Sequence, residues 1–300
     1  MHSVVDRRGV TLGFSAYLIW GMFPLYFQLL ARSGAFEIVA YRIVVALVFC
    51  LLAIVATRTW HRFVKVLRTP RTVLVLLVAG LLVSTNWTLY VWGVNNGYAI
   101  DAALGYFINP LVSAAFGVLL LGERMRRLQW AAFGVGALAV VVLTVGYGQV
   151  PWVALGLAFS FGTYGLAKKK VGASVPPLPG LAIETAATTP IALGYLIWLA
   201  VGGLHTVVPF TGYGALVLLS GPLTAIPLLL FAAAAIRIPL STLGILQYIA
   251  PIMQFLAGWL VIGEPMPLER WIGFIIIWVA VAIFLFDALR AGRAGSNGRR

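Results

Sequence analysis

Ten long apolar runs, separated by short gaps, constrain this chain more than any other feature of its sequence. A helix that crosses the hydrocarbon core of a bilayer needs about 20 consecutive, mostly apolar residues. The runs cover residues 10–31, 36–57, 71–93, 99–121, 129–146, 150–167, 179–201, 212–234, 240–262 and 269–289. Because the gaps leave no room for a soluble domain, the sequence predicts an all-α integral membrane protein with ten transmembrane helices in the lipid bilayer.

The composition agrees with a membrane environment. Hydrophobic residues make up 62% of the chain and charged residues only 10%, whereas about 25% of an average soluble domain is charged. The formal net charge of +13 raises the alternative of a nucleic-acid partner. The basic residues lie in short gaps between apolar runs, however, and this placement favours membrane orientation over nucleic-acid binding.

The basic residues also predict which way the chain enters the membrane. Lys and Arg gather in the two tails and in every second gap, as in Arg7–Arg8, Arg58–Arg71 and Lys168–Lys170, while the other gaps hold only Arg32 and Arg270. Cytoplasmic loops carry such an excess of Lys and Arg. We therefore expect a cytoplasmic N-tail (residues 1–9), a cytoplasmic C-tail (residues 290–300) and an even number of spans.

The two halves of the chain resemble each other at one fixed offset, which places Phe107 on Tyr248. An ungapped comparison of Phe107–Val140 with Tyr248–Val281 finds eleven identities in 34 positions. The least common matches are Pro110/Pro251, Gly122/Gly263, Glu123/Glu264 and Trp130/Trp271. The offset predicts two repeats of five helices, at residues 10–146 and 150–289. Since five is odd, the second repeat enters the membrane upside down.

Inverted repeats are typical of secondary transporters, in which a substrate binds near the midplane between the repeats. The sequence therefore predicts a permease that works by alternating access around a central cavity. A duplication that only stabilises a scaffold is the simpler alternative. An intramembrane enzyme acting on a lipid or isoprenoid, and a channel, are two others. The sequence contains no catalytic constellation, nucleotide-binding motif or metal-ligand spacing, so we expect no enzymatic activity, no cofactor and a gradient as the energy source.

Several long motifs resemble a known family. They are NWTLYVWGVNN (Asn86–Asn96), LGYFINPL (Leu104–Leu111), LGERMRRLQW (Leu121–Trp130), GPLTAIPLLLF (Gly221–Phe231) and STLGILQYIAP (Ser241–Pro251). They resemble the RarD group of the EamA family, in the drug/metabolite transporter (DMT) superfamily, over nearly the whole chain. The resemblance implies a ten-helix, two-repeat permease of the bacterial inner membrane. The group carries a label of chloramphenicol sensitivity, and related exporters move amino acids and other small metabolites. Asp101 stands where the family pattern has Glu, one methylene longer.

Three charged residues within the predicted spans are candidates for function, because intramembrane charges are costly. Arg42 is a candidate to bind a substrate carboxylate through its planar fork of donors; alternatively it snorkels, or clamps helices by pairing with Glu37 or with backbone carbonyls. Glu184 lies close to the repeat counterpart of Arg42. Glu184 and Asp101 are candidates to carry a coupling proton. The alternative for Glu184 is a structural anchor that pairs with Lys168–Lys170.

Polar residues near the predicted kinks complete the candidate site. Asn86 and Tyr90 share a face of one helix, where they line a cavity or, in the case of Asn86, hydrogen-bond between helices. Pro110 and Pro251 each free a carbonyl, those of Tyr106 and Gln247. The residues expected to surround these kinks and bind substrate are Tyr106, Asn109, Gln247, Tyr248 and Gln254. Pro110, Pro251, Pro222 and Pro227 are candidate hinges, and we expect Gly122–Glu123 and Gly263–Glu264 to shape turns.

Overall fold

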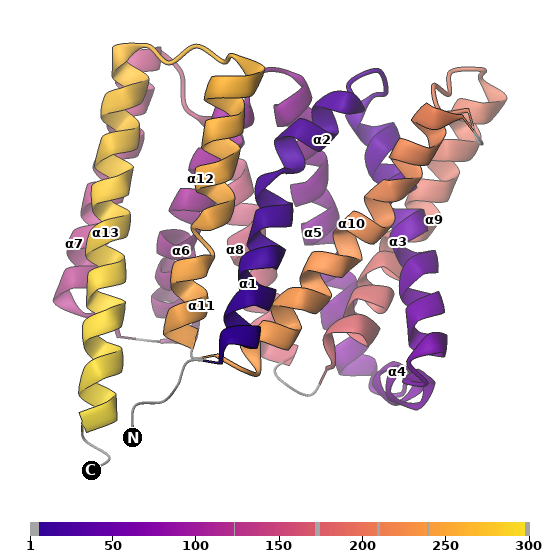
Figure 1. Ribbon diagram of the computed structural model, residues 1–300, viewed down its shortest axis with the longest axis horizontal. Helices are drawn as coiled ribbons and strands as arrows, with labels where there is room; N and C mark the ends of the chain where they lie inside the picture. The colour runs from indigo at the N-terminus through magenta and orange to yellow at the C-terminus, as the bar shows by residue number, and fades with distance from the viewer. Residues whose placement is uncertain (1–5, 123, 172–174, 209–210, 239, 298–300) are drawn as a thin grey trace.

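The computed structural model describes residues 6–122, 124–171, 175–208, 211–238 and 240–297. The described residues form helices joined by short turns (Figure 1). In chain order the helices are α1 (Arg7–Gly21), α2 (Phe23–Leu29), α3 (Ala35–Ala56), α4 (Trp60–Leu67), α5 (Pro70–Asn95), α6 (Ala99–Leu121), α7 (Arg127–Tyr147), α8 (Trp152–Val171), α9 (Pro177–Val201), α10 (Gly212–Ala235), α11 (Leu240–Leu246), α12 (Ile249–Leu256), the π-helix η2 (Ala257–Ile262) and α13 (Leu268–Asn297).

Nine segments of the described chain are long and apolar enough to cross a membrane. Two of them combine shorter helices: α1 with α2, and α11 with α12 and η2. The predicted class, a helical membrane protein, is confirmed. The remaining predicted span corresponds to α8, which forms a helix of 20 residues but ends in Lys168, Lys169 and Lys170 and is not among the nine. The count of ten therefore stays a prediction.

The span predicted over residues 240–262 matches a candidate span at Thr242–Ile262, and its helix is broken near the kink expected from Pro251. It is interrupted at Gln247 and Tyr248, and α12 begins only at Ile249. Pro251 explains the break, because it has no N–H to offer the carbonyl of Gln247. Pro110 has a milder effect, since α6 continues through it. Pro222 and Pro227 likewise lie inside an unbroken α10.

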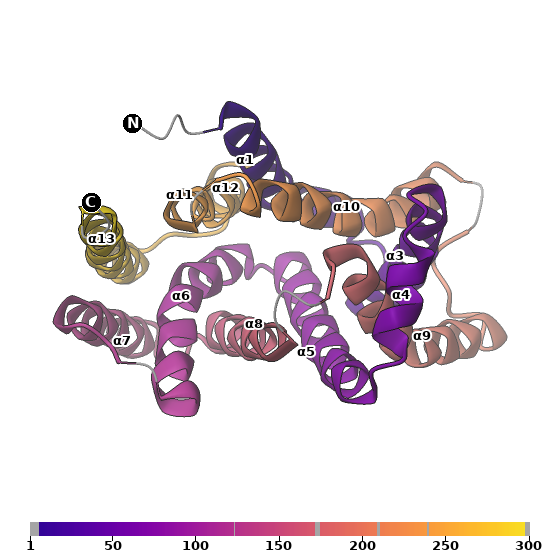
Figure 2. The ribbon, with the colours of Figure 1, turned by 90° about the horizontal axis from the view of Figure 1, so that it is seen from below.

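The helices pack in two layers (Figure 2). One layer holds α7, α6, α8, α5 and α9, and the other holds α13, α11 with α12, α1, α10 and α3. The first turn of α1 and the last turn of α13 lie at the same end of the bundle, which we call the terminal end (Figure 1). The layers meet where α7 packs on α13, α6 on α12 and α9 on α3.

Close helix contacts recur at the offset that relates the two halves of the sequence, which we call the repeat offset. A Cβ added to Gly21 would meet Met253. At the repeat offset Gly21 corresponds to Gly162, and Val112 corresponds to Met253. A Cβ added to Gly162 would meet Val112 in the same way. Gly122 and Gly263 also correspond, and both end a helix in the left-handed conformation, with φ of 68° and 77°. Glycine favours that conformation because it has no Cβ. Glu123 lies outside the described residues.

Candidate functional site

Arg42 of α3 is buried between the two layers, with 3% of its surface exposed. Its Nε donates a hydrogen bond to Thr224 Oγ1 of α10 at 2.6 Å. Thr224 Oγ1 in turn donates to the carbonyl of Ser220 at 2.7 Å. The backbone of α10 fixes the Thr224 hydroxyl, and this hydroxyl holds the Nε edge of the guanidinium in place. The two terminal nitrogens of Arg42 take no part in this contact.

Aromatic rings surround the guanidinium of Arg42. Its Cζ lies 4.4 Å from the ring centroid of Trp87, 5.4 Å from Phe23 and 5.5 Å from Phe27. A cation attracted to ring faces gains modest stabilisation. Within the part of the chain that the structure describes, no carboxylate lies within ion-pair distance of Arg42. The predicted alternative of a pair with Glu37 does not occur, because Glu37 accepts hydrogen bonds from Thr206 and Val207.

Asn86, Tyr90 and Tyr106 extend this site. Asn86 Nδ2 donates to the carbonyl of Leu157 and to Ser160 Oγ, while Tyr106 donates its hydroxyl to Asn86 Oδ1 at 3.2 Å. The Tyr90 ring contacts those of Tyr106 and Phe27, at centroid distances of 5.7 and 6.0 Å. We call the set that surrounds Arg42 the central cluster; it consists of Phe23, Phe27, Arg42, Asn86, Trp87, Tyr90, Tyr106 and Thr224.

The hydroxyl of Tyr90 is buried without a hydrogen-bond partner. Buried polar atoms nearly always have a partner, so an orphan of this kind needs an explanation. Arg42 likewise has no carboxylate partner in the described residues. The Tyr90 hydroxyl and the Arg42 guanidinium therefore give the central cluster unsatisfied donors among aromatic rings. That combination is suited to an organic molecule that carries an anionic group.

Four predicted site residues lie elsewhere. No hydrogen bond or ring contact among the described residues joins Asn109, Gln247, Tyr248 or Gln254 to Arg42. Tyr248 stacks on Phe107 at 6.3 Å, and Gln254 Nε2 donates to the carbonyl of Trp20. Asn109 Oδ1, Tyr248 Oη and Gln254 Oε1 are buried without partners. Tyr248 thus contacts α6 and Gln254 contacts α1, and within the described chain neither forms a hydrogen bond or ring contact with the central cluster.

Glu184 of α9 forms a closed polar group with α8. Its Oε1 accepts from Lys168 Nζ at 2.6 Å and its Oε2 accepts from the Tyr164 hydroxyl at 3.1 Å. The Glu184 side chain is fully buried, and that of Lys168 is 34% exposed. The predicted pairing with the lysine run is therefore present. The carboxylate is satisfied in this conformation, in contrast to the guanidinium of Arg42.

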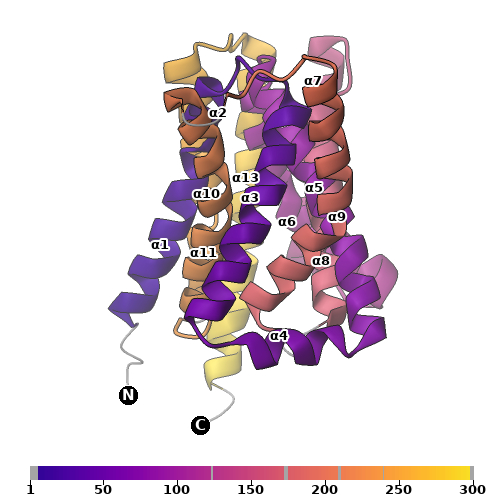
Figure 3. The same ribbon diagram turned by 90° about the vertical axis from the view of Figure 1, so that its right-hand side faces the viewer.

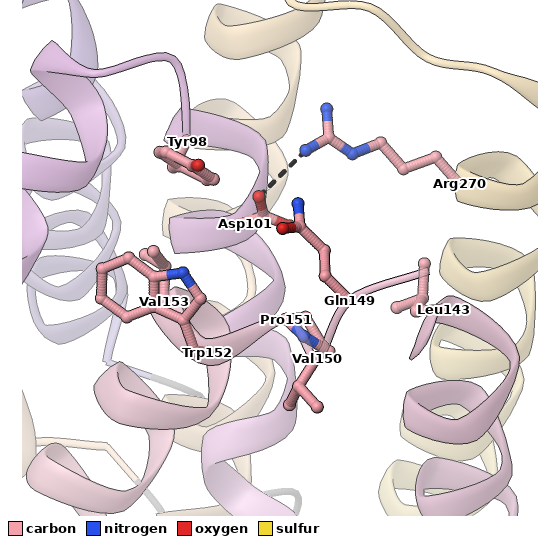
Figure 4. A pocket seen from close by; sticks show the side chains of 9 residues that line it. All are labelled: Tyr98, Asp101, Leu143, Gln149, Val150, Pro151, Trp152, Val153 and Arg270. Carbon is pink, nitrogen blue, oxygen red and sulfur yellow. Dashed lines mark hydrogen bonds and ion pairs between the residues drawn. The ribbon is translucent and has the colours of Figure 1, made fainter. Parts of the chain in front are cut away.

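Asp101 lies in the first turn of α6, at the end of the bundle opposite the terminal end, and its side chain points toward Arg270 (Figure 4). Its Oδ2 accepts from Arg270 Nη2 at 2.9 Å, and Arg270 Nη1 donates to the carbonyl of Pro265. The pair lines a small pocket with Tyr98, Gln149 and Trp152. Asp101 is thus paired with a basic residue and separate from the central cluster.

Glu264 holds the start of the same helix. Its carboxylate accepts hydrogen bonds from the backbone N–H groups of Ala99 and Ile100, at 2.5 and 2.9 Å. Burial raises the pKa of the Glu264 carboxyl, and the two N–H groups oppose that rise. A carboxylate at a helix N-terminus also complements the helix dipole. Glu264 therefore links the η2–α13 turn to α6 in addition to shaping a turn.

Sequence patterns missed part of the site. Phe23 and Phe27 lie in the central cluster but have no polar atom to mark them, and Arg270 was counted only as an orientation signal. The available signal for Arg270 was that its set of alternate gaps holds only one other basic residue, Arg32. In the described ranges, no group of three or more His, Cys, Asp or Glu residues is placed to hold a metal ion.

Comparisons with known proteins agree with a transporter. The model of the EamA-like transporter family matches the chain twice, at residues 7–145 and 150–286. A protein named RarD from Streptomyces exfoliatus is 50% identical over 96% of this chain and 91% of its own length. An uncharacterized transporter from Pseudomonas aeruginosa is 44% identical over 96% of both chains. A solved crystal structure matches with a TM-score of 0.63 at 23% identity, over 94% of this chain and 97% of its own, and supports the fold.

Proposed function

This chain belongs to the EamA-like transporter family, and we propose that it is a secondary transporter of a small organic anion or amino acid-like zwitterion, with no enzymatic activity. One observation carries the proposal: Arg42 is a buried cation with no carboxylate partner in the described residues. An isolated buried charge is costly, and a substrate that brings the missing carboxylate removes that cost. The planar guanidinium can bind such a carboxylate with two parallel hydrogen bonds.

The rest of the central cluster suits the other parts of such a substrate. Tyr90 offers an unpaired hydroxyl, and its ring contacts those of Tyr106 and Phe27. Ligand sites are commonly mainly apolar, with a few polar groups that set orientation. The cluster takes residues from both layers, α3 and α10 on one side and α5 and α6 on the other. Relative movement of the layers would therefore expose it to one face of the membrane and then the other.

Arg42 lies seven residues into α3, about 10 Å from its start at 1.5 Å per residue. We place the terminal end of the bundle in the cytoplasm of the bacterial cell, because the basic gaps lie there. In this orientation the central cluster lies nearer the outer surface of the inner membrane. The buried Asp101–Arg270 pair then lies above it, where it would have to rearrange for a substrate to pass along that side of α6.

The proposal also includes coupling of transport to protons. Glu184 is fully buried and its partner Lys168 is partly exposed, so Lys168 could withdraw toward the cytoplasm and leave a carboxylate that needs a proton. We propose Glu184, rather than Asp101, as the coupling residue. The variant Glu184→Gln would keep counterflow exchange but lose accumulation driven by a pH gradient. Unchanged proton-driven accumulation would remove Glu184 from this role.

The deciding experiment is counterflow in liposomes that contain the purified protein, with labelled amino acids and chloramphenicol as probes. Arg42→Gln is compared with Arg32→Gln, which removes the same charge from an exposed residue on the same side of the molecule. We expect saturable counterflow of a carboxylate-bearing probe that falls at least about 100-fold in Arg42→Gln, the loss of roughly 3 kcal/mol for a charged hydrogen-bonded contact. Arg32→Gln should retain it. Equal flux in the two variants would contradict the assignment of the site.

A further inference from the structure

Helix α4 has no part in the central cluster and has an unusual position. It lies across the terminal end of the bundle between α3 and α5, as both side views show (Figures 1 and 3). It is strongly amphipathic. At 100° per residue, its polar side chains fall on one side of the helix and its apolar side chains on the other: His61, Arg62 and Lys65 against Trp60, Phe63, Val64, Val66 and Leu67.

Only part of the apolar face of α4 packs on the protein. Val66 is buried against Leu76 of α5 and Ile183 of α9. Trp60 and Leu67, in contrast, are 52% and 45% exposed. Helices that lie in the plane of a membrane interface bury an apolar face of this kind among the lipid headgroups, and Trp is favoured there. The ends of α3 and α5 place α4 at that depth.

The polar side of α4 and its flanks carry only positive charge. Between residues 58 and 71 there is no Asp or Glu. None of the basic side chains in this stretch forms an ion pair within the described chain, and all are exposed: Arg58, Arg62, Lys65, Arg68 and Arg71. Other basic residues toward the terminal end behave differently, since Arg126 pairs with Asp287 and Arg237 with Asp6. The α4 stretch is thus a concentrated positive charge without internal partners.

Arg58 adds an independent observation. It has a φ of +53°, the one positive value among non-glycine residues that the structure describes. This conformation brings Cβ close to the following carbonyl, so glycine is the usual residue where a helix ends in this way. A long basic side chain thus occupies a position where the backbone favours glycine.

We propose that α4 with its flanks, residues 58–71, is a binding surface for anionic phospholipid headgroups. Trp60 and Leu67 enter the interface, and the five cations bind headgroup phosphates. Because Val66 packs on Ile183, the residue before Glu184, bound lipid also holds the start of α9. The inference concerns lipid binding alone and does not depend on which substrate is carried.

The test measures lipid composition next to α4 directly. Cys50 is the single cysteine and is buried, so a His61→Cys variant can be labelled with bimane in a Cys50→Ala background. The protein is reconstituted in phosphatidylcholine vesicles that contain a small fraction of nitroxide-labelled phosphatidylglycerol or nitroxide-labelled phosphatidylcholine. A nitroxide quenches bimane only at short range, so the ratio of the two quenching constants reports which lipid lies beside α4.

The α4 variant combines Arg58→Gly, Arg62→Gln, Lys65→Gln and Arg68→Gln, and Arg58→Gly also suits the local backbone. The control removes the same number of exposed cations toward the same end but outside α4: Arg7→Gln, Arg8→Gln, Arg124→Gln and Arg127→Gln. A cation near an anionic surface can change affinity by up to about fivefold. We therefore expect phosphatidylglycerol to quench at least about threefold more strongly than phosphatidylcholine in the parent, and the ratio to approach one in the α4 variant.

Salt supplies a second readout. At about 1 M salt the Debye length falls to about 3 Å, and the preference for phosphatidylglycerol should largely disappear in the parent. Three results would each overturn the proposal. They are a ratio of one in the parent, a control variant that loses as much preference as the α4 variant, and a preference that salt does not change.

Discussion

Arg42 and Glu184 occupy nearly equivalent places in the two halves of the chain, yet they have opposite charge and opposite surroundings. The repeat offset carries Arg42 to Ile183, the immediate neighbour of Glu184. Arg42 meets three aromatic rings and one hydroxyl. Glu184 meets Lys168 and Tyr164, which satisfy both of its oxygens.

A close backbone contact lies near each of these two residues. Gly80 of α5 packs on the backbone of Glu184 in α9, and Gly221 of α10, the counterpart of Gly80 at the repeat offset, packs on the backbone of Val45 in α3. Both halves thus have a close backbone contact at a corresponding glycine, while the side-chain chemistry nearby differs. In this conformation the satisfied charge of Glu184 joins α8 to α9, and the unsatisfied charge of Arg42 is available to a ligand.

The largest expected effect comes from breaking the satisfied pair. Lys168→Met leaves the Glu184 carboxylate buried with only the Tyr164 hydroxyl. We expect the free energy of unfolding, measured by titration with SDS, to fall by about 3 kcal/mol, the lower end of the range for a broken buried pair because Lys168 is partly exposed. Lys170→Met, which changes an exposed neighbour, should stay within about 0.5 kcal/mol of the parent.

A double variant separates the pair from its surroundings. Adding Glu184→Met to Lys168→Met removes the stranded charge and should recover most of the lost stability, since an apolar pair often replaces an ion pair without cost. If the double variant is as unstable as Lys168→Met alone, the effect comes from altered packing of α8 and not from the carboxylate.

The sequence predicted the scaffold because hydropathy and the repeat both describe backbone. Long apolar runs located the spanning helices, and the matched Gly122 and Gly263 do end helices with positive φ. Hydropathy alone does not mark a local break inside such a span, and the position of proline does. Residues 240–262 are mostly apolar, and the break at Gln247 was expected from Pro251 and not from hydropathy. Hydropathy averages over about 19 residues, so it cannot register one missing hydrogen bond.

The side-chain partners were less predictable, because they depend on how distant helices are rotated. Arg42 meets Thr224, 182 residues away, and Asp101 meets Arg270, 169 residues away. A single sequence carries no information on such pairings. The expectation that Tyr106, Tyr248 and Gln254 surround one site assumed that the two proline kinks meet. The structure instead brings Tyr106 to Asn86, and Gln254 to α1.

A smaller effect tests whether the scaffold is equivalent in the two halves. A Cβ at Gly80 would collide with the carbonyl oxygen of Glu184, and one at Gly221 would lie 2.7 Å from the carbonyl carbon of Val45. Since backbone cannot move aside cheaply, we expect Gly80→Ala and Gly221→Ala each to cost about 2 kcal/mol of unfolding free energy. Gly134→Ala in α7 has open space and should gain up to about 1 kcal/mol from helix propensity. A large cost at only one of the two sites would show that the repeats are not mechanically equivalent.

The smallest effect has the opposite sign and sharpens the contrast between Arg42 and Lys168. Arg42→Met replaces a buried, carboxylate-free cation with an apolar side chain of similar length, and Thr224 keeps its bond to Ser220. We expect the unfolding free energy to stay level or to rise by about 1 kcal/mol, although counterflow is lost. Thr224→Val, which instead strands the Arg42 Nε, should cost about 1 kcal/mol or more. If Arg42→Met were as destabilising as Lys168→Met, Arg42 would be a structural clamp between helices. The difference between Arg42 and Glu184 would then no longer support a role for Arg42 in substrate binding.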